Sequence, residues 1–319
     1  MENNYTVYIS VSKEWLNVEW TFHQLILDIA DQIKREKGAT IINVPNCQFV
    51  QDDIPYVIYD CELLLHDKQN DSLTLISFFD NMSRTLSLFE KRNNPKDLVC
   101  YSQLSKTNLF EQHRVDNRKY RIVPNIHIPS FSFHTADNPV DKFYNKRQET
   151  DKSKFFDKMI FRGTAAISAT CRMPILLLNG HHYFTGHDYH PDYFDELTYH
   201  KVGLSVPGVG EVGMRDLEYM SVGIPMLRME YTYPSPLNPP LIPNYHYIAI
   251  DRIDPTSDEE RMGGKNPFNY AMAYLNKFEE IKDDQDLLDF ISKNSRKYYE
   301  DYLHVNVRQK HIMEISEIA

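Results

Sequence analysis

The sequence predicts an α/β protein made of two domains that face each other across a cleft. Segments with strand character alternate with segments of helical spacing in both halves of the 319 residues, which is typical of parallel sheets covered by helices. A hydrophobic content of 42% is sufficient for two cores. Residues 129–155 are polar, contain two prolines and lack periodicity, as expected of a linker. We therefore expect domains at 1–140 and 141–319, the second including the C-terminal helices.

The first half should contribute a series of strands and two helices. Apolar residues recur on one face of residues 14–36 and stop before Gly38, which is a favoured C-cap residue, so this segment predicts a helix. A second helix is expected at 81–91. Strands are expected at 5–11, 40–44, 54–65, 72–79, 98–104 and 120–128, and the polar residues between 65 and 72 favour a hairpin.

The second half repeats the alternation. A short strand at 158–163 ends at a glycine and is followed by a helix to about residue 173. Further strands are expected at 200–208, 224–229 and 245–250, a helix at 211–222, and helices from about 267 onward.

Composition excludes several classes of protein. A formal charge of −10 argues against broad binding of nucleic acid, which needs clustered Lys and Arg. The four cysteines are widely spread without a CxxC pair, so neither a zinc ribbon nor a disulfide framework is expected. From the N-terminal composition and the lack of long apolar runs we expect neither a signal peptide nor a membrane span, and we expect a cytoplasmic protein in a reducing compartment.

Two glycine turns indicate a site for an anion. Ligands of open α/β sheets bind at the carboxyl ends of the strands, and a following helix directs free N–H groups and partial positive charge there. Two segments fall at such ends, and glycine allows close approach of the backbone to a ligand. They are Arg162-Gly163-Thr164 and Pro207-Gly208-Val209-Gly210.

Arginine strengthens this interpretation, because a guanidinium donates paired hydrogen bonds to phosphate oxygens. Arg162 stands at the first strand end, and Arg172 follows about two helical turns later. A salt bridge within the domain is the other interpretation of both. On the next helix Glu211, Arg215 and Glu218 can share one face. Arg215 would then face phosphate and Glu218 accept hydrogen bonds from ribose hydroxyls; the alternative is an ion-pair ladder at the surface.

These motifs carry a resemblance to a known family. FRG at 161–163, Arg172 and HKVGLSVPGVGEVGMRDLEYMSVGIPML at 200–227 resemble the donor-binding half of GT-B glycosyltransferases, over roughly residues 155–250. The nearest likeness is to the exostosin-like and protein O-glucosyltransferase (capsule-associated) families. It implies two Rossmann-like domains and a nucleotide diphosphate sugar, most often UDP-linked, as donor. It also implies that Arg162, Lys201 and Arg215 face the diphosphate, although a lysine at a strand start is often merely solvated.

We expect no obligatory metal or other cofactor. Metal-dependent glycosyltransferases of the GT-A type place an Asp-x-Asp triplet at a strand end, whereas the triplet of this chain, Asp284-Gln285-Asp286, falls in the late helical region. Acidic residues favour helix starts for electrostatic reasons. The phosphate charge would therefore be neutralised by arginines and helix N-termini.

An inverting transfer needs a base that deprotonates the acceptor hydroxyl. Asp80 is the candidate, because it follows an apolar strand and so stands at that strand's carboxyl end. Asp80 could instead cap the helix that begins near Met82. Asp52, Asp53 and Asp60 are weaker candidates, and a retaining mechanism stays open.

The sequence thus favours a glycosyltransferase that moves a sugar from a nucleotide diphosphate donor to a carbohydrate or glycan acceptor. Two alternatives remain. One is a non-catalytic nucleotide- or sugar-binding protein of the same fold. The other is a zinc-dependent hydrolase that uses the histidines of residues 181–200, although their spacing matches no metal motif. These histidines are His181, His182, His187, His190 and His200.

Overall fold

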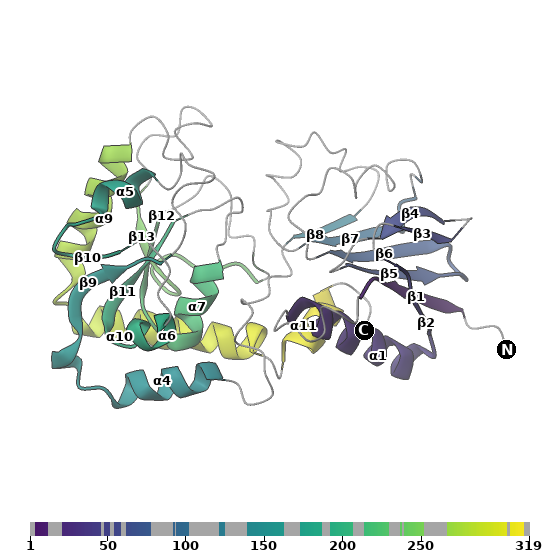
Figure 1. The fold of residues 1–319 in the computed structure, drawn as a ribbon, viewed down its shortest axis with the longest axis horizontal. Coiled ribbons are helices and arrows are strands. Elements are labelled where there is room, and N and C mark those ends of the chain that lie inside the picture. Colours follow the sequence, from purple (N-terminus) through teal and green to yellow (C-terminus); the bar gives the residue numbers. More distant parts are fainter. Residues whose placement is uncertain are drawn as a thin grey trace. The chain divides into compact units, whose positions relative to one another are not determined.

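The computed structural model describes the chain at residues 4–11, 21–45, 48–51, 54–58, 62–77, 92, 94–101, 121–124, 139–162, 173–186, 192–206, 214–229, 237, 239–251, 267–304 and 307–315. The chain forms two compact units, each a sheet with helices packed on it (Figure 1). Unit 1 comprises Met1–His134, Pro236–Asn238 and Val305–Ala319, and unit 2 comprises Thr135–Ser235 and Pro239–His304.

Unit 1 contains a six-stranded mixed sheet in the order β2-β1-β5-β6-β7-β8. The parallel sheet predicted for this half is therefore wrong in part, because β5 runs antiparallel to both β1 and β6. The strands are β1 (Tyr5–Ile9), β2 (Thr40–Asn43), β5 (Glu62–Asp67), β6 (Ser72–Ser77), β7 (Leu98–Tyr101) and β8 (Arg121–Pro124). A separate antiparallel pair is formed by β3 (Gln48–Gln51) and β4 (Ile54–Ile58).

The turn between β5 and β6 explains the mixed sheet and confirms the predicted hairpin. The Asp67 carboxylate accepts hydrogen bonds from the backbone N–H groups of Gln69 and Asn70, at 3.0 and 3.2 Å. Asp71 then takes a φ of 47°, a left-handed conformation that Asp tolerates in turns. A connection this short can join only antiparallel neighbours, whereas parallel strands need a long crossover.

Two helices from opposite parts of the sequence cover one face of this sheet. Helix α1 (Thr21–Lys37) buries Leu25, Ile29 and other apolar residues in the unit 1 core. Beside it lies α11 (Arg308–Ile315), which adds Ile312 and Met313 to the same core (Figure 1). Placing every C-terminal helix in the domain 141–319 was therefore wrong for α11. Its short amphipathic pattern shows that it is buried but not against which sheet.

Unit 2 contains a five-stranded sheet in the order β10-β9-β11-β12-β13, and every pair of neighbours in it is parallel, as predicted. In chain order the arrangement is 2-1-3-4-5, one of the two common doubly wound orders. The strands are β9 (Phe156–Ile160), β10 (Phe184–Thr185), β11 (His200–Ser205), β12 (Met226–Met229) and β13 (Ile248–Ile250).

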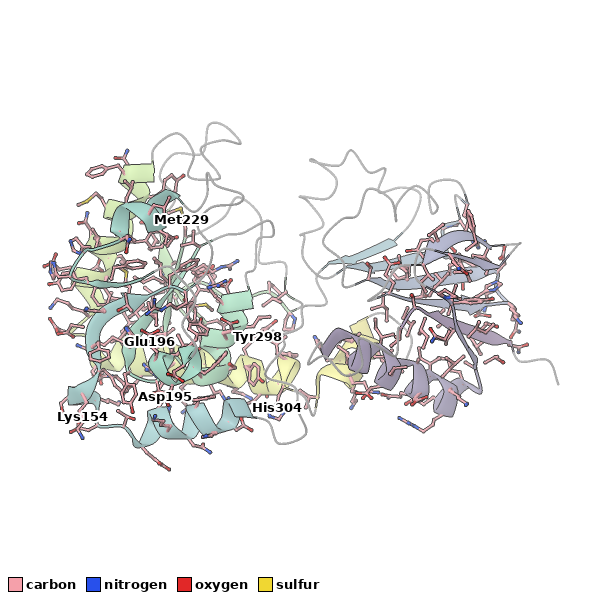
Figure 2. The ribbon with its side chains drawn as sticks, in the orientation of Figure 1. Lys154, Asp195, Glu196, Met229, Tyr298 and His304 are labelled. Atoms are coloured by element: carbon pink, nitrogen blue, oxygen red, sulfur yellow. The ribbon has the colours of Figure 1, made fainter. Side chains whose placement is uncertain are left out.

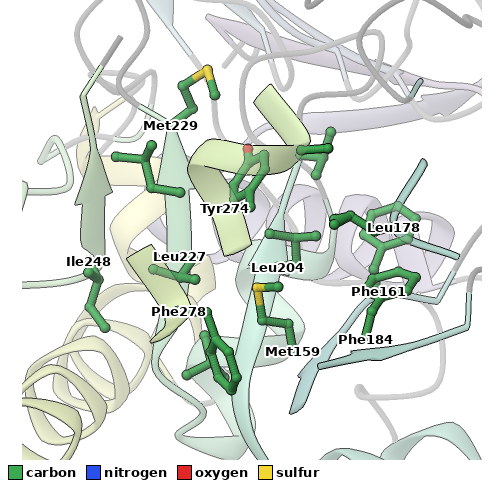
Figure 3. Close-up of a cluster of buried hydrophobic side chains, with 14 of the residues drawn as sticks. Met159, Phe161, Leu178, Phe184, Leu204, Leu227, Met229, Ile248, Tyr274 and Phe278 are labelled. Atoms are coloured by element: carbon green, nitrogen blue, oxygen red, sulfur yellow. The ribbon is translucent and has the colours of Figure 1, made fainter. Parts of the chain in front are cut away.

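Helices pack on both sides of this sheet. Helix α5 contacts α9, whereas α4, α6 and α10 gather around α7 (Figure 1). Figure 3 shows Tyr274 and Phe278 of α9 in one core cluster with Leu204 and Leu227 of the sheet. The helices are α4 (Pro139–Glu149), α5 (Met173–Leu178), α6 (Tyr193–Leu197), α7 (Met214–Val222), α9 (Pro267–Ile281) and α10 (Gln285–Tyr298), with the short turns η3 (Lys152–Lys154) and η4 (Tyr299–Leu303).

Helix α4 corrects the predicted linker at 129–155. Pro139 occupies its first position, Asp141 its first turn and Arg147 its last turn, an order that suits the helix dipole. The polar composition of this helix hid its pattern, because the face that packs on the rest of unit 2 includes the buried Arg147.

The two ends of unit 2 meet at one carboxylate. Asp141 Oδ1 accepts a hydrogen bond from Arg296 Nη2 at 2.6 Å, and its Oδ2 lies 3.3 Å from His304 Nε2. His304 follows η4, the last element before the chain returns to unit 1 (Figure 2). No described helix is both long and apolar enough to cross a lipid bilayer.

Candidate functional site

The predicted anion site falls where the strand order of unit 2 reverses. The chain passes from β9 outward to β10 and then returns to β11 on the other side of β9. The strand that follows β9 in the sequence thus lies on one side of the β9–β11 pair, and the strand that follows β11 lies on the other. In open α/β sheets such a switch point is where ligands bind, at the carboxyl ends of the strands. Arg162 stands two residues after the end of β9, and the segment 207–210 begins two residues after the end of β11.

Arg215, the second residue of α7, binds the end of β9. Its Nε donates a hydrogen bond to the backbone oxygen of Arg162, and its guanidinium carbon lies 4.9 Å from the centre of the Phe161 ring. No carboxylate of the described residues forms an ion pair with Arg215. The N-terminal turn of α7 is thereby fixed at the switch point, with a half-buried cation whose remaining N–H groups can bind an oxyanion.

Arg162 is held by a carboxylate from α6. Its Nε and Nη2 donate to the two oxygens of Glu196 at 2.8 and 2.6 Å, a paired geometry that fixes the guanidinium plane. Gly186, just after β10, makes room for this pair, because a Cβ there would lie 2.6 Å from Arg162 Nη1. Arg162 thus stands at the predicted carboxyl end of β9, with part of its N–H donors already bound to Glu196.

Glu218 lies one turn after Arg215 and is 7% exposed. Its Oε2 accepts a hydrogen bond of 2.8 Å from the hydroxyl of Tyr193, which is also buried. Burial, with the Glu218 carboxylate close by, raises the pKa of Tyr193, so this phenol stays protonated and donates. The pair fixes the rotamer of Glu218 on the same helix that presents Arg215.

Contacts along α7 and just after its C-terminus fix its orientation on the sheet. The Tyr219 ring covers Gly203 of β11, where a Cβ would lie 2.7 Å from the ring, and its hydroxyl donates to the Ile160 oxygen at 2.9 Å. At the far end Arg147 Nε donates to the Gly223 oxygen at 3.2 Å, and Arg296 Nη1 donates to the Ser221 oxygen. Cations at the C-terminus of a helix complement its dipole.

Lys201 does not belong with these residues. It stands at the start of β11, and its ammonium forms ion pairs with Asp157 and, at 3.9 Å, with Asp283. Asp157 likewise stands at the start of the parallel neighbour β9. Four residues of strand, about 13 Å, separate Lys201 from the end of β11. The predicted placement of Lys201 beside the diphosphate is therefore corrected. Lys201 lies at the amino-terminal ends of the strands, whereas the predicted diphosphate site lies at their carboxyl ends.

Several predicted site residues lie outside the described residues. They are Asp80, Gly163, Thr164, Arg172, Pro207, Gly208 and Gly210. Sequence reasoning also missed Glu196 and Tyr193, which bind Arg162 and Glu218. Their partners are 34 and 25 residues away, so no local pattern could reveal them.

The described histidines have structural contacts. His181 and His182 stack at 4.5 Å between ring centres. His200 is buried, with Nε2 2.8 Å from Thr185 Oγ1 and Nδ1 2.9 Å from the backbone oxygen of Glu196. Burial lowers the pKa of His200 to about 4. Among the described residues no three His, Cys, Asp or Glu side chains gather as a metal site would require, and His187 and His190 lie outside them.

Comparison with known proteins gives structural likenesses only. No protein-family model matches the chain, and no curated protein matches it by sequence, so the nearer resemblance to the exostosin-like and protein O-glucosyltransferase families stays a prediction. A glycosyltransferase from Rickettsia africae is similar at 11% identity and a TM-score of 0.47, with 99% of each chain covered. HepE of Anabaena in complex with UDP is similar at 8% identity and a TM-score of 0.47, covering 98% of this chain and 99% of that one. At 8% identity and a TM-score of 0.36, WaaG, a glycosyltransferase of lipopolysaccharide biosynthesis, covers 97% and 98%.

Proposed function

We propose that this protein is a glycosyltransferase that moves a sugar from a UDP-linked donor to a hydroxyl group of a carbohydrate or glycan acceptor. The observation that carries the proposal is the position of Arg215. It joins the N-terminal turn of α7 to the end of β9 at the switch point of a doubly wound sheet. Helix N-termini and arginine at such a point favour a diphosphate.

Each described residue of the site has a proposed role in donor binding. Arg215 donates to the diphosphate, together with the free N–H groups at the start of α7. Arg162, oriented by Glu196, adds positive charge beside it. Glu218 accepts hydrogen bonds from the ribose hydroxyls, and Tyr193 sets its orientation. The glycine-containing loops after β9 and β11 complete the proposed site.

The transfer itself follows from this placement. The acceptor oxygen forms a bond to the anomeric carbon while the bond from that carbon to the diphosphate oxygen breaks, and UDP leaves with the electron pair. Asp80 is the proposed base that takes the acceptor proton. The acceptor attacks from the face opposite the diphosphate, and this single displacement makes the proposed reaction inverting. Arg215, Arg162 and the helix N-terminus stabilise the negative charge of the departing diphosphate, so the proposed reaction needs no metal.

UDP binding tests the donor site. Calorimetric titration should show that Arg215→Ala weakens UDP binding about 10- to 100-fold, the size expected for losing a charge-assisted hydrogen bond. Lys201→Met is the matched control, because Lys201 lies at the other edge of the same sheet, and this variant should bind UDP like the parent. Equal losses in the two variants would contradict the assignment. Thermal midpoints check that both variants are folded.

The chemistry is tested separately from binding. Slow hydrolysis of a UDP-sugar should persist in EDTA and disappear in Asp80→Asn while UDP affinity is retained. Loss of activity in EDTA would favour a metal-dependent enzyme, including the zinc hydrolase of the sequence analysis. UDP binding without any turnover would favour the non-catalytic nucleotide-binding protein.

A further inference from the structure

A cavity lies at the amino-terminal ends of the unit 2 strands, opposite the proposed donor site. It has a volume of about 380 Å³ and is lined by residues from α4, the start of β11, the segment before β12 and α10. All of its lining residues belong to unit 2 and to the described part of the chain. Neither the proposed donor site nor the proposed base uses it.

Four of the five charged residues that line the cavity are cations. Arg147, Lys152, Lys201 and Lys293 contribute positive charge, and Asp289 is the carboxylate among the residues that line it. Lys152 forms an ion pair with Asp289, and Lys201 forms one with Asp157. Lys293 and Arg147 form no ion pair with a described carboxylate. The cavity therefore holds positive charge beyond what its own carboxylate compensates.

Arg147 is the most informative of these residues. It is only 6% exposed, and its Nε and Nη1 donate to backbone oxygens, including those of Gly223 at 3.2 Å and His200 at 2.7 Å. Its Nη2 has no acceptor among the described residues. A buried guanidinium is usually matched by a carboxylate or another anion, because uncompensated charge is costly in a low dielectric.

The balance of charge at Arg147 agrees with this geometry. Burial lowers the pKa of Arg147 to about 9, and the distant Asp289 opposes that shift only in part. The Phe155 ring, whose centre lies 4.5 Å from the Arg147 guanidinium carbon, and the backbone oxygens compensate part of this charge, and an anion in the cavity would add to that compensation. The cavity is also larger than an inorganic phosphate, and the side chains of Gln148 and Gln285 line it beside the cations, so hydroxyl groups of a ligand would find partners.

We propose that this cavity binds the phosphate group of a small phosphorylated polyol, at a site separate from the donor site. The phosphate lies between Arg147 Nη2 and the Lys293 ammonium, and the polyol part extends toward the two glutamines. Binding is ionic and reversible, and it requires no covalent step.

The test uses inorganic phosphate and glycerol 3-phosphate as probes, titrated calorimetrically into the full chain at low salt. Lys293→Gln should weaken the binding of both probes about tenfold. The matched control is Lys297→Gln on the same helix, since Lys297 pairs with Asp301 and does not line the cavity. This variant should bind both probes like the parent. Glycerol 3-phosphate should bind more tightly than phosphate.

A change of opposite sign makes the test sharper. Asp289→Asn removes the carboxylate of the lining and releases Lys152, so it should tighten phosphate binding several-fold. The proposal is overturned if Lys293→Gln and Lys297→Gln behave alike, or if Asp289→Asn weakens binding.

Arg215→Ala separates this site from the proposed donor site. It should leave unchanged the component of probe binding that Lys293→Gln weakens. A loss in Arg215→Ala rather than Lys293→Gln would mean that phosphate binds at the other edge and would overturn the second site. A failure to bind UDP would refute the proposed function without affecting this outcome.

Discussion

His200 shows how the environment of one residue becomes a dependence of stability on pH. It is 1% exposed, and both ring nitrogens have partners, Thr185 Oγ1 and the backbone oxygen of Glu196. Glu196 in turn holds Arg162, so the neutral imidazole supports the backbone of a residue that orients part of the proposed site.

The expected titration follows from the lowered pKa. Because burial lowers the pKa of folded His200 to about 4, the unfolded chain binds the proton more readily between that value and about 6.5. Stability from this residue is therefore complete above pH 6.5 and is lost as the pH falls toward 4. The free energy of unfolding of unit 2, measured in urea, should depend less on pH in His200→Gln than in the parent. The difference between the two pH slopes should correspond to about one proton taken up on unfolding. Burial also lowers the pKa of His246, which supplies a background common to both proteins. Equal pH slopes would contradict the prediction.

At the scale of elements, the position of α7 on β11 depends on the absence of one side chain. Any Cβ at Gly203 would press on the Tyr219 ring, whose hydroxyl anchors the helix to the β9 backbone. Gly203→Ala should cost roughly 1–3 kcal/mol of unfolding free energy, as overpacking of a close contact does. Chemical denaturation measures this loss. In a Tyr219→Leu background the same substitution should cost clearly less, whereas an unchanged cost would show that the ring is not the cause.

The strands and their order along the chain were the features most accessible from sequence, because apolar runs bounded by glycine and proline carry a local signal. The strand ends at Arg162 and before Pro207 were found for that reason. The Arg162–Glu196 pair, the antiparallel β5 and the opposite-edge position of Lys201 depend on contacts between distant segments or on strand direction. Local periodicity encodes neither the contacts between distant segments nor the direction of a strand in its sheet.

At the scale of the whole molecule, unit 1 is completed by a helix from the far end of the sequence. Ile312 and Met313 of α11 are each 1% exposed, in the core that α1 covers. Gln309 Nε2, on the same helix, donates a hydrogen bond of 2.7 Å to the backbone oxygen of Asp28. Along the sequence, most of unit 2 therefore falls between the first and the last segment of unit 1.

This connection predicts which half of the molecule responds to a change in α11. Met313→Ala should destabilise unit 1 by about 2–5 kcal/mol, the usual cost of emptying a core position. Hydrogen exchange followed by mass spectrometry should show faster exchange in peptides from β1 and α1, with little change in β11 and β12. The exposed neighbour Glu314 provides the control variant Glu314→Ala. Faster exchange in unit 2 instead would contradict the division of the chain.

The contacts of Asp141 with Arg296 and His304 join the beginning and the end of unit 2. During translation, this middle part of the polypeptide has all of its own residues once His304 has left the ribosome. The first sheet, although synthesised earlier, must wait for residues 308–315 before its core is covered. On the ribosome unit 2 would then complete its fold before unit 1, although unit 1 begins earlier in the sequence. Until α11 is synthesised, the strands β1–β8 would be a substrate for chaperones.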